Sequence, residues 1–198
     1  IHAPWSNGNI YWDAGSDNNG GYDRIEKNAS TQNYEGQWNH WAFVKNTATG
    51  KMEIYLNGTL WHSGTNKKLT MEGITKFQMG AAITYKGPYN GRINEFAIWN
   101  KALDQTTIAN YMYHSLDANH PFAANLQVYY PFNETTGLTA TDASGNKNDA
   151  TLIGYPQWRS LHPTQLYANV NLTNWRPQIQ LGMGQFLSDV GQDLAYAE

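Results

Sequence analysis

The stretch MEIYLNGTLWHSG, residues 52–64, decides the fold of this chain. Apolar side chains recur at every second position from Met52 to Leu56, which is the period of a strand with one buried face. Asn57 and Gly58 then supply the positive φ angles that a two-residue type I′ turn requires. The residues after the turn lead back as a partner strand, so the stretch predicts a β-hairpin.

The composition of the 198-residue chain favours a β-rich domain and excludes several classes of function. Only 15% of the residues are charged and the net charge is -3, which is unlike a basic nucleic-acid-binding surface. The chain has no cysteine, so neither disulfides nor thiolate chemistry contribute. No apolar run approaches the roughly 18 residues of a membrane span. Eight Trp and thirteen Tyr suit an extracellular β-rich protein with polar ligands, although packed sheets also use such rings as core.

Further strands and one helix are predicted from the periodicity of the sequence. Asp104 is a natural N-cap for the helix, and both faces of the strand at 38–46 are apolar in the middle, which is typical of a central strand buried on both sides. After the helix the sequence pattern predicts a strand with a turn, followed by a polar loop and another strand. The expected elements are strands at 9–15, 38–46, 76–80 and 92–100, a helix at 103–116, a strand and turn at 125–137, and a loop and strand at 139–154.

Residues 36–113 resemble the second half of a laminin G-like jelly-roll domain, a member of the concanavalin A-like lectin/glucanase superfamily. The resemblance rests on a tryptophan-led strand, a strand ending in Tyr-x-Asn-Gly, the run GRINEF at 91–96 and the run LDQTTI at 103–108, in that order. It implies an all-β fold: an antiparallel β-sandwich of the jelly-roll type with one short helix.

The order of the family's elements in this chain is unusual. The run VYYPFNETTGLTATDASGNKNDATLIGYPQW, residues 128–158, resembles the opening of such a domain, yet it follows the closing elements. We therefore expect residues 1–118 to form a laminin G-like domain without its first strands. Residues 119–160 would either open a following unit or complete the first sandwich by permutation, and residues 161–198 are an unassigned tail. The chain starts inside a pattern, without an initiator Met or a signal peptide, so we expect it to be part of a longer protein.

The sequence offers no catalytic machinery for glycoside hydrolysis, although the superfamily includes endo-glucanases. Those enzymes need two carboxylates about 5 Å apart, when they retain configuration, and carry them in a Glu-x-Asp-x-x-Glu run. The nearest stretch here, INEFAIW, offers only Glu95, and the resemblance assigns that residue to a structural strand. The six His residues show no metal-binding spacing, and no nucleophile motif is present. We expect no enzyme activity in this chain.

Two Asp- and Asn-rich loops are candidates for a structural Ca²⁺ ion, which requires six to eight oxygen ligands. The first loop carries Asp13, Asp17 and Asp23, and the second carries Asp142 and Asp149. The resemblance raises this expectation, because related jelly-roll domains often hold calcium. The alternative is that both loops are ordinary turns, where Asp, Asn and Gly are preferred for backbone reasons.

Exposed aromatic side chains are the candidates for sugar binding, because rings stack on the apolar faces of pyranoses while polar neighbours bind the hydroxyls. We expect Tyr85 and Tyr89 in a Gly/Pro loop, Trp61 and His62 after the hairpin turn, and Trp12 to contact a ligand. Trp61 and His62 are adjacent, so at most one of them should point into the sandwich.

These observations predict a non-catalytic carbohydrate-binding or adhesion module of a larger secreted or cell-surface protein. Its partners would be a glycan or an extracellular protein, and the neighbouring domains of the parent protein. A structural spacer or protein-interaction module is the first alternative, and a glycoside hydrolase-related domain is the second.

Overall fold

Short antiparallel strands make up most of the regular structure. The computed structural model describes residues 1–17, 20–74, 76–81, 89–154 and 156–159. None of the helices among these residues has the length and hydropathy that a membrane crossing needs. The elements are β1 (Asn9–Ser16), β2 (Tyr22–Asn28), η1 (Thr31–Asn33), β3 (Trp41–Asn46), β4 (Lys51–Leu56), β5 (Thr59–Gly64), β6 (Phe96–Trp99), α1 (Gln105–Tyr111), η2 (Ala123–Asn125), β7 (Leu126–Tyr130), β8 (Thr139–Ala140) and β9 (Ala150–Thr151).

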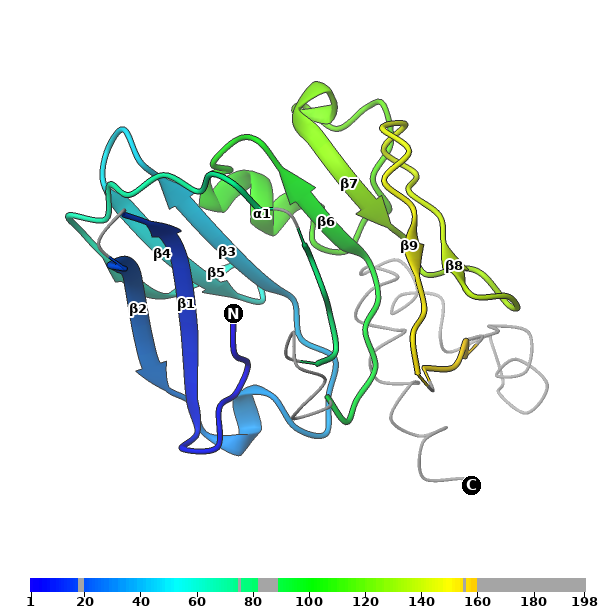
Figure 1. Ribbon diagram of the computed structural model, residues 1–198, viewed down its shortest axis with the longest axis horizontal. Coiled ribbons are helices and arrows are strands. Elements are labelled where there is room, and N and C mark those ends of the chain that lie inside the picture. The colour runs from blue at the N-terminus through cyan, green and yellow to red at the C-terminus, as the bar shows by residue number, and fades with distance from the viewer. Residues whose placement is uncertain (18–19, 75, 82–88, 155, 160–198) are drawn as a thin grey trace, which may run out of the picture.

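The core lies between two layers, the β1–β2 hairpin and the three-stranded sheet β3-β4-β5. Figure 1 shows the hairpin in front of the sheet. Ile10 of β1 and Met52 and Ile54 of β4 are fully buried between them, and Trp41 and Phe43 of β3 pack against this cluster. The prediction of an all-β antiparallel sandwich with a short helix is therefore confirmed.

The hairpin at residues 52–64 forms as its sequence predicts. Leu56 pairs with Thr59, and the two residues between them have φ angles of 49° at Asn57 and 75° at Gly58. Gly58 is also the point where α1 packs on the turn. A Cβ atom at this position would lie 3.0 Å from the Cβ of Ala109 and 3.1 Å from the Sδ of Met112, so the helix packs closely on this glycine.

A buried ion pair joins the two layers. The Nζ of Lys45 lies 2.6 Å from the Oδ2 of Asp23, and the two side chains are only 4% and 10% exposed. The same ammonium donates to the carbonyl oxygen of Ala14 at 2.8 Å, and the backbone N–H of Leu69 donates to Asp23 at 2.9 Å. The pair therefore connects β1, β2 and β3 with the segment that follows β5.

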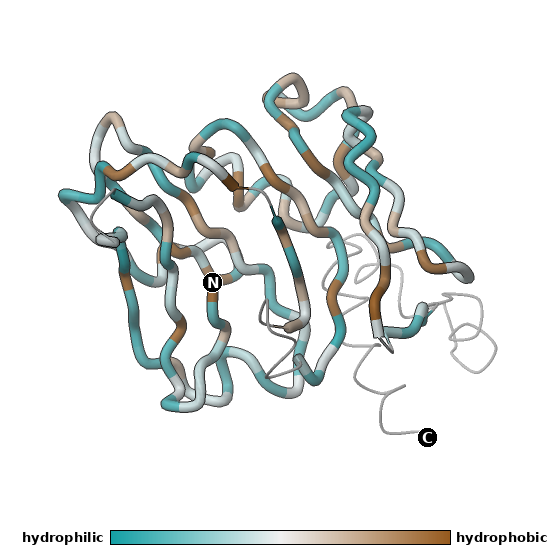
Figure 2. Tube along the Cα trace, viewed as in Figure 1, coloured by the Kyte–Doolittle hydropathy of each residue, from teal (hydrophilic) through white to brown (hydrophobic). Residues whose placement is uncertain are grey.

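The second pair of sheets comes from residues on both sides of α1. β6 pairs antiparallel with β7, with Phe96 opposite Tyr130, and β8 pairs with β9. Figure 1 shows these strands beside the two-layer part of the molecule, and Figure 2 shows the loop between β8 and β9 as almost wholly hydrophilic. A strand from 119–160 thus joins a strand from 1–118 in one sheet. The division of the chain at these boundaries stays a prediction.

Several predicted elements differ from the structure. β3 begins at Trp41, rather than at residue 38, and is an edge of its sheet with half-buried residues, because β4 takes the central position. Residues 76–80 are not a strand: Phe77 is 54% exposed, and its ring stacks on Phe96 instead. The strand predicted at 92–100 is limited to β6 because Glu95, with a φ angle of 56°, interrupts the extended backbone.

The predicted helix at 103–116 is shorter, although its start is confirmed. Asp104 is the N-cap, and its Oδ1 accepts a hydrogen bond of 2.7 Å from the backbone N–H of Thr107. The helix ends after Tyr111, whose ring packs against His120 at 4.3 Å between centroids. The chain turns back there to bring these two rings together.

The Lys45→Met variant tests the buried ion pair. Methionine retains the length of the side chain but leaves the Asp23 carboxylate buried without its cation, so the free energy of unfolding in urea should fall by about 3–5 kcal/mol. The control is Lys51→Met on the next strand, where the side chain is 57% exposed and a change within about 0.5 kcal/mol is expected. Equal effects of the two substitutions would contradict a special role for Lys45.

The same pair predicts a loss of stability in acid. Burial favours the neutral carboxyl of Asp23, but hydrogen bonds from Lys45 and from the N–H of Leu69 outweigh it and hold the pKa below the ordinary 3.8. Because the pKa of Asp23 is lower in the folded state, its ionised carboxylate stabilises the protein when the pH is above the unfolded-state pKa. This stabilisation disappears as the pH falls through the folded-state pKa. Asp23→Asn should be less stable at pH 7 and should lose less stability between about pH 5 and pH 2, as measured by urea unfolding at each pH.

The Gly58→Ala variant tests the contact between the turn and α1. Alanine at a positive φ angle costs roughly 1 kcal/mol, and the clash with Ala109 and Met112 should add about 1–3 kcal/mol. Gly36→Ala is the matched control, because Gly36 has a φ angle of 72° and no atom within 4 Å of an added Cβ. Urea unfolding should show the larger loss for Gly58→Ala, and equal losses would rule out a packing role for this glycine.

Candidate functional site

The two faces of β1 differ in chemistry because alternate side chains point to opposite sides of the hairpin. Ile10, Trp12 and Ala14 point inward and are 0%, 9% and 6% exposed. Tyr11 and Asp13 lie between them in sequence and occupy the outer face, where both are partly exposed. The burial of three apolar side chains therefore presents an aromatic hydroxyl and a carboxylate to solvent.

On that outer face, Arg24 of β2 lies between two tyrosine rings and a carboxylate. Arg24 pairs with Asp13 across the hairpin, and its Nη2 donates to the Oδ2 of Asp13 at 2.9 Å. Its guanidinium carbon lies 4.7 Å from the ring centroid of Tyr11 and 5.0 Å from that of Tyr22. The hydrogen bonds to Asp13 raise the pKa of Arg24, so the guanidinium is a fixed cation in a fixed orientation.

The N-terminal segment adds two more rings to this surface. His2 and Tyr11 exchange backbone hydrogen bonds of 3.0 Å, which place His2 3.8 Å from Asp13. The ring of Trp5 meets that of His2 edge to face at 4.6 Å and is 51% exposed. Burial is the main cause that lowers the pKa of His2, so this ring is neutral at neutral pH.

We call this surface the Arg24 face and define it by His2, Trp5, Tyr11, Asp13, Tyr22 and Arg24. Amide groups lie at its edge: Asn7 donates to the hydroxyl of Tyr11 at 2.8 Å, and Asn28 donates to Asn9 at 3.0 Å. Half-exposed rings, a planar donor, a carboxylate and amides are the groups that can bind the apolar faces and the hydroxyls of a sugar.

The ligand residues predicted from the sequence do not form one exposed cluster. Trp12 lies in the core, with its ring 5.7 Å from that of Phe43, which removes it from the ligand-binding candidates. Tyr89 is 49% exposed in a separate segment, where its backbone N–H donates to Gly80 at 2.7 Å. Tyr85 lies outside the described residues.

Trp61 and His62 lie at a β-bulge, which alters the expected alternation. Ile54 pairs with His62 and Tyr55 pairs with Leu60, so Trp61 is the extra residue of the bulged strand. As a result, both side chains are half-buried, rather than one inside and one outside. The indole ring of Trp61 packs edge to face on Trp41 at 5.4 Å, and the Nζ of Lys27 covers it at 4.7 Å.

The described carboxylates of the first candidate loop have partners within the protein, and calcium binding by this loop stays a prediction. Asp13 is paired with Arg24 and Asp23 with Lys45, so two of the three expected ligands are already neutralised by cations. Asp17 accepts a hydrogen bond of 2.7 Å from the backbone of Gly21. Among the described residues no group of three His, Cys, Asp or Glu side chains could hold a metal ion.

The second candidate loop is organised by Asp142, which is 7% exposed. Its Oδ1 accepts hydrogen bonds from the backbone N–H groups of Tyr129 and Ser144, and its Oδ2 accepts one from Asn148. Burial opposes ionisation, but these bonds outweigh it and lower the pKa of Asp142. Its oxygens thus have a structural use in a turn, and bound calcium stays a prediction from the resemblance.

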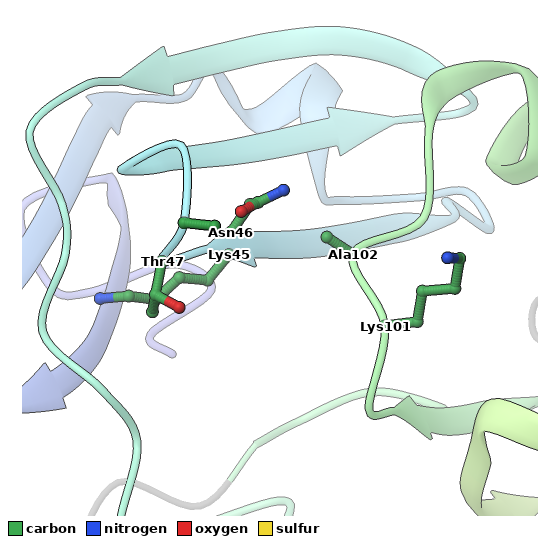
Figure 3. A pocket seen from close by; sticks show the side chains of 6 residues that line it. Lys45, Asn46, Thr47, Lys101 and Ala102 are labelled. Atoms are coloured by element: carbon green, nitrogen blue, oxygen red, sulfur yellow. The ribbon is translucent and has the colours of Figure 1, made fainter.

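A hollow of about 320 Å³ lies between the β3–β4 turn and the segment before α1. Lys45 and Lys101 line it, and Figure 3 shows their side chains directed away from each other. The Nζ of Lys45 is bound by Asp23, and that of Lys101 lies 4.7 Å over the ring of Phe122. Because both cations have partners within the protein, this hollow is a weaker candidate than the Arg24 face.

Sequence reasoning missed His2, Tyr22 and Arg24. The signal that could have found the outer face is the alternation in NIYWDAG, residues 9–15, which separates Trp12 from Tyr11. Which residues of β2 lie beside Tyr11 and Asp13 depends on the register of the hairpin. The glycine-rich loop between the two strands does not allow this register to be predicted from the sequence.

The comparison with solved structures gives two similar chains. A protein from Bacteroides ovatus ATCC 8483, described as a "putative carbohydrate binding protein", is 21% identical with a TM-score of 0.50. The match covers 68% of this chain and 41% of that one, so this chain spans less than half of its neighbour. An S-layer domain-containing protein (residues 221–444) from Clostridium thermocellum ATCC 27405 is 22% identical, with a TM-score of 0.34 and coverage of 52% and 51%. This second likeness is too weak to bear on the fold.

The search among curated proteins found no match to this chain. A family model described as the concanavalin A-like lectin/glucanases superfamily, Laminin_G_3, matches residues 1–109, which include the β1–β2 hairpin, the β3–β5 sheet and most of α1. This match covers more than half of the chain and agrees with the sandwich described above. The chain therefore belongs to the concanavalin A-like lectin/glucanase superfamily.

Proposed function

We propose that this chain is a non-catalytic carbohydrate-binding module and that the Arg24 face is its ligand surface. The observation that carries the proposal is the position of Arg24 between the rings of Tyr11 and Tyr22, beside the Asp13 carboxylate. Membership of a lectin-like superfamily and the description of the Bacteroides neighbour support the class of ligand.

The charges of this surface favour a neutral glycan. Arg24 and Asp13 neutralise each other, so the face attracts neither sign of charge strongly. The pair still offers donors and acceptors side by side, because a guanidinium only donates and a carboxylate only accepts. Adjacent sugar hydroxyls, which do both, match this arrangement.

A non-catalytic role is supported by the sequence, because the Glu-x-Asp-x-x-Glu run expected of a glucanase is missing from it. In the structure, Glu53 accepts a hydrogen bond of 3.1 Å from the hydroxyl of Tyr55, and Glu95 accepts one from Tyr129.

The setting we propose is a module of a larger secreted or cell-surface protein. The aromatic composition, the superfamily and the partial coverage of the longer Bacteroides neighbour support this setting. A protein-interaction module is the second candidate, and one observation favours it. Met71, Ile74 and Phe77 are 51%, 66% and 54% exposed within one short segment, which is typical of a protein contact surface.

A glycan array probed with the full chain tests the proposed function. Binding to neutral glycans is expected, followed by calorimetry with the strongest oligosaccharide. Tyr22→Ala and Trp5→Ala remove rings that are 53% and 51% exposed, so each should weaken binding about tenfold, or about 1.4 kcal/mol.

Tyr89→Ala is the matched control, because this tyrosine is 49% exposed but belongs to a different segment. It should bind the glycan as the unchanged protein does. Loss of binding in Tyr89→Ala, with Tyr22→Ala unaffected, would move the site to the loop predicted from the sequence. Failure to bind any glycan, together with self-association or capture of an extracellular protein, would favour the interaction module.

A further inference from the structure

A cavity of about 380 Å³ opens at the end of α1, among residues that the family match does not reach. It is lined by Asn110 and Tyr111 at the end of the helix and by the segment that follows, with His114, Asp117, Asn119 and His120. None of these residues belongs to the Arg24 face. Its volume lies at the small end of the range for ligand pockets, which suits one small molecule or one unit of a polymer.

His120 gives the cavity a hydrogen-bond donor on a largely buried ring. It is 4% exposed and lies between Trp99, at 4.5 Å, and Tyr111, at 4.3 Å between ring centroids. Its Nδ1 accepts a hydrogen bond of 3.1 Å from the backbone N–H of Phe122. Burial lowers the pKa of His120, so the ring is neutral and its one proton is on Nε2.

That Nε2–H group has no acceptor among the described residues, and Nε2 is not one of the buried polar atoms that lack a partner, so solvent reaches it. Water bound to such a donor can be displaced by a ligand group that reproduces its hydrogen bond. Since His120 lines the cavity, an acceptor brought by a ligand would take the place of this water.

The rim of the cavity is held in place by an Asp–Asn turn. The backbone N–H of Asn119 donates to the Oδ1 of Asp117 at 2.8 Å, and its side-chain amide donates to the Oδ2 at 3.1 Å. These bonds fix a carboxylate and an amide that both remain exposed. A carboxylate can accept about four hydrogen bonds, so Asp117 retains capacity for donors of a ligand.

The wall of the cavity is aromatic. The rings of Tyr111 and His114 lie 6.1 Å apart at an angle of 62°. Such rings contact apolar C–H groups, while the polar groups of the rim require a partner that both donates and accepts. A metal ion does not suit this place, since the described residues include no set of three ligands for one.

We infer that this cavity is a second sugar site, which binds a single neutral pyranose unit. A ring hydroxyl accepts from the Nε2–H of His120, other hydroxyls donate to Asp117, and the apolar face of the pyranose packs on Tyr111 and His114. This inference rests on the ligand class of the proposed function, but it assigns a separate site on different elements.

Nuclear magnetic resonance of the ¹⁵N-labelled full chain tests the inference. The probes are the methyl glycosides of mannose, galactose, glucose and N-acetylglucosamine, each added to millimolar concentration. At least one should shift the backbone amides of residues 110–120 and the Nε2–H signal of His120. Asn110→Ala and His114→Ala, both at exposed positions, should weaken this binding about five- to tenfold.

Gln105→Ala on the first turn of the same helix is the matched control and should leave the binding constant unchanged. Tyr22→Ala should also retain glycoside binding here, because it alters the Arg24 face alone. If glycosides or the array oligosaccharide shift only amides of the Arg24 face, the second site is overturned and the proposed function stands. If no glycan or glycoside binds anywhere, both proposals fail.

Discussion

The Nζ of Lys45 lies at a place where four segments of the chain meet. It contacts Asp23 of β2 and donates to the carbonyl of Ala14 in β1. Asp23 in turn accepts a hydrogen bond from the N–H of Leu69. A buried charge is tolerated only when its partners are in place, so this cluster sets how the β1–β2 hairpin lies on the β3–β5 sheet. Two apolar surfaces could shift against each other at little cost in free energy. An ammonium that donates to two defined acceptors allows only a small range of positions for the two layers.

The outer surface depends on this inner arrangement. Asp23 and Arg24 are neighbours in β2 and point to opposite sides, one into the core and one to solvent. Each meets an oppositely charged residue, Lys45 on the inside and Asp13 on the outside. When the inner pair fixes the hairpin, it also fixes the register in which Arg24 faces Asp13 and lies between two tyrosine rings.

Local chemistry made the hairpin and the start of the helix predictable. Asn57 and Gly58 adopt the positive φ angles that the turn requires, and the side chain of Asp104 caps α1. Neither feature needs a residue that is distant in the sequence. The errors arise where distant partners decide. Phe77 lies in a stretch predicted as a strand but stacks on Phe96 without joining a sheet, and the bulge at Trp61 follows from its pairing with β4. The position of the His120 ring depends on Phe122 and two flanking rings, which no spacing in the sequence reveals.

The pairing of β6 with β7 bears on how this protein can be divided in the laboratory. The family match ends at residue 109, yet among the described residues the ladder partner of β6 comes from Leu126–Tyr130. A recombinant fragment cut at the end of the match would expose the backbone N–H and C=O groups along that edge, and free edges promote association between chains. The boundary suggested by homology is therefore not a boundary of hydrogen bonding, and a soluble fragment should extend beyond β7.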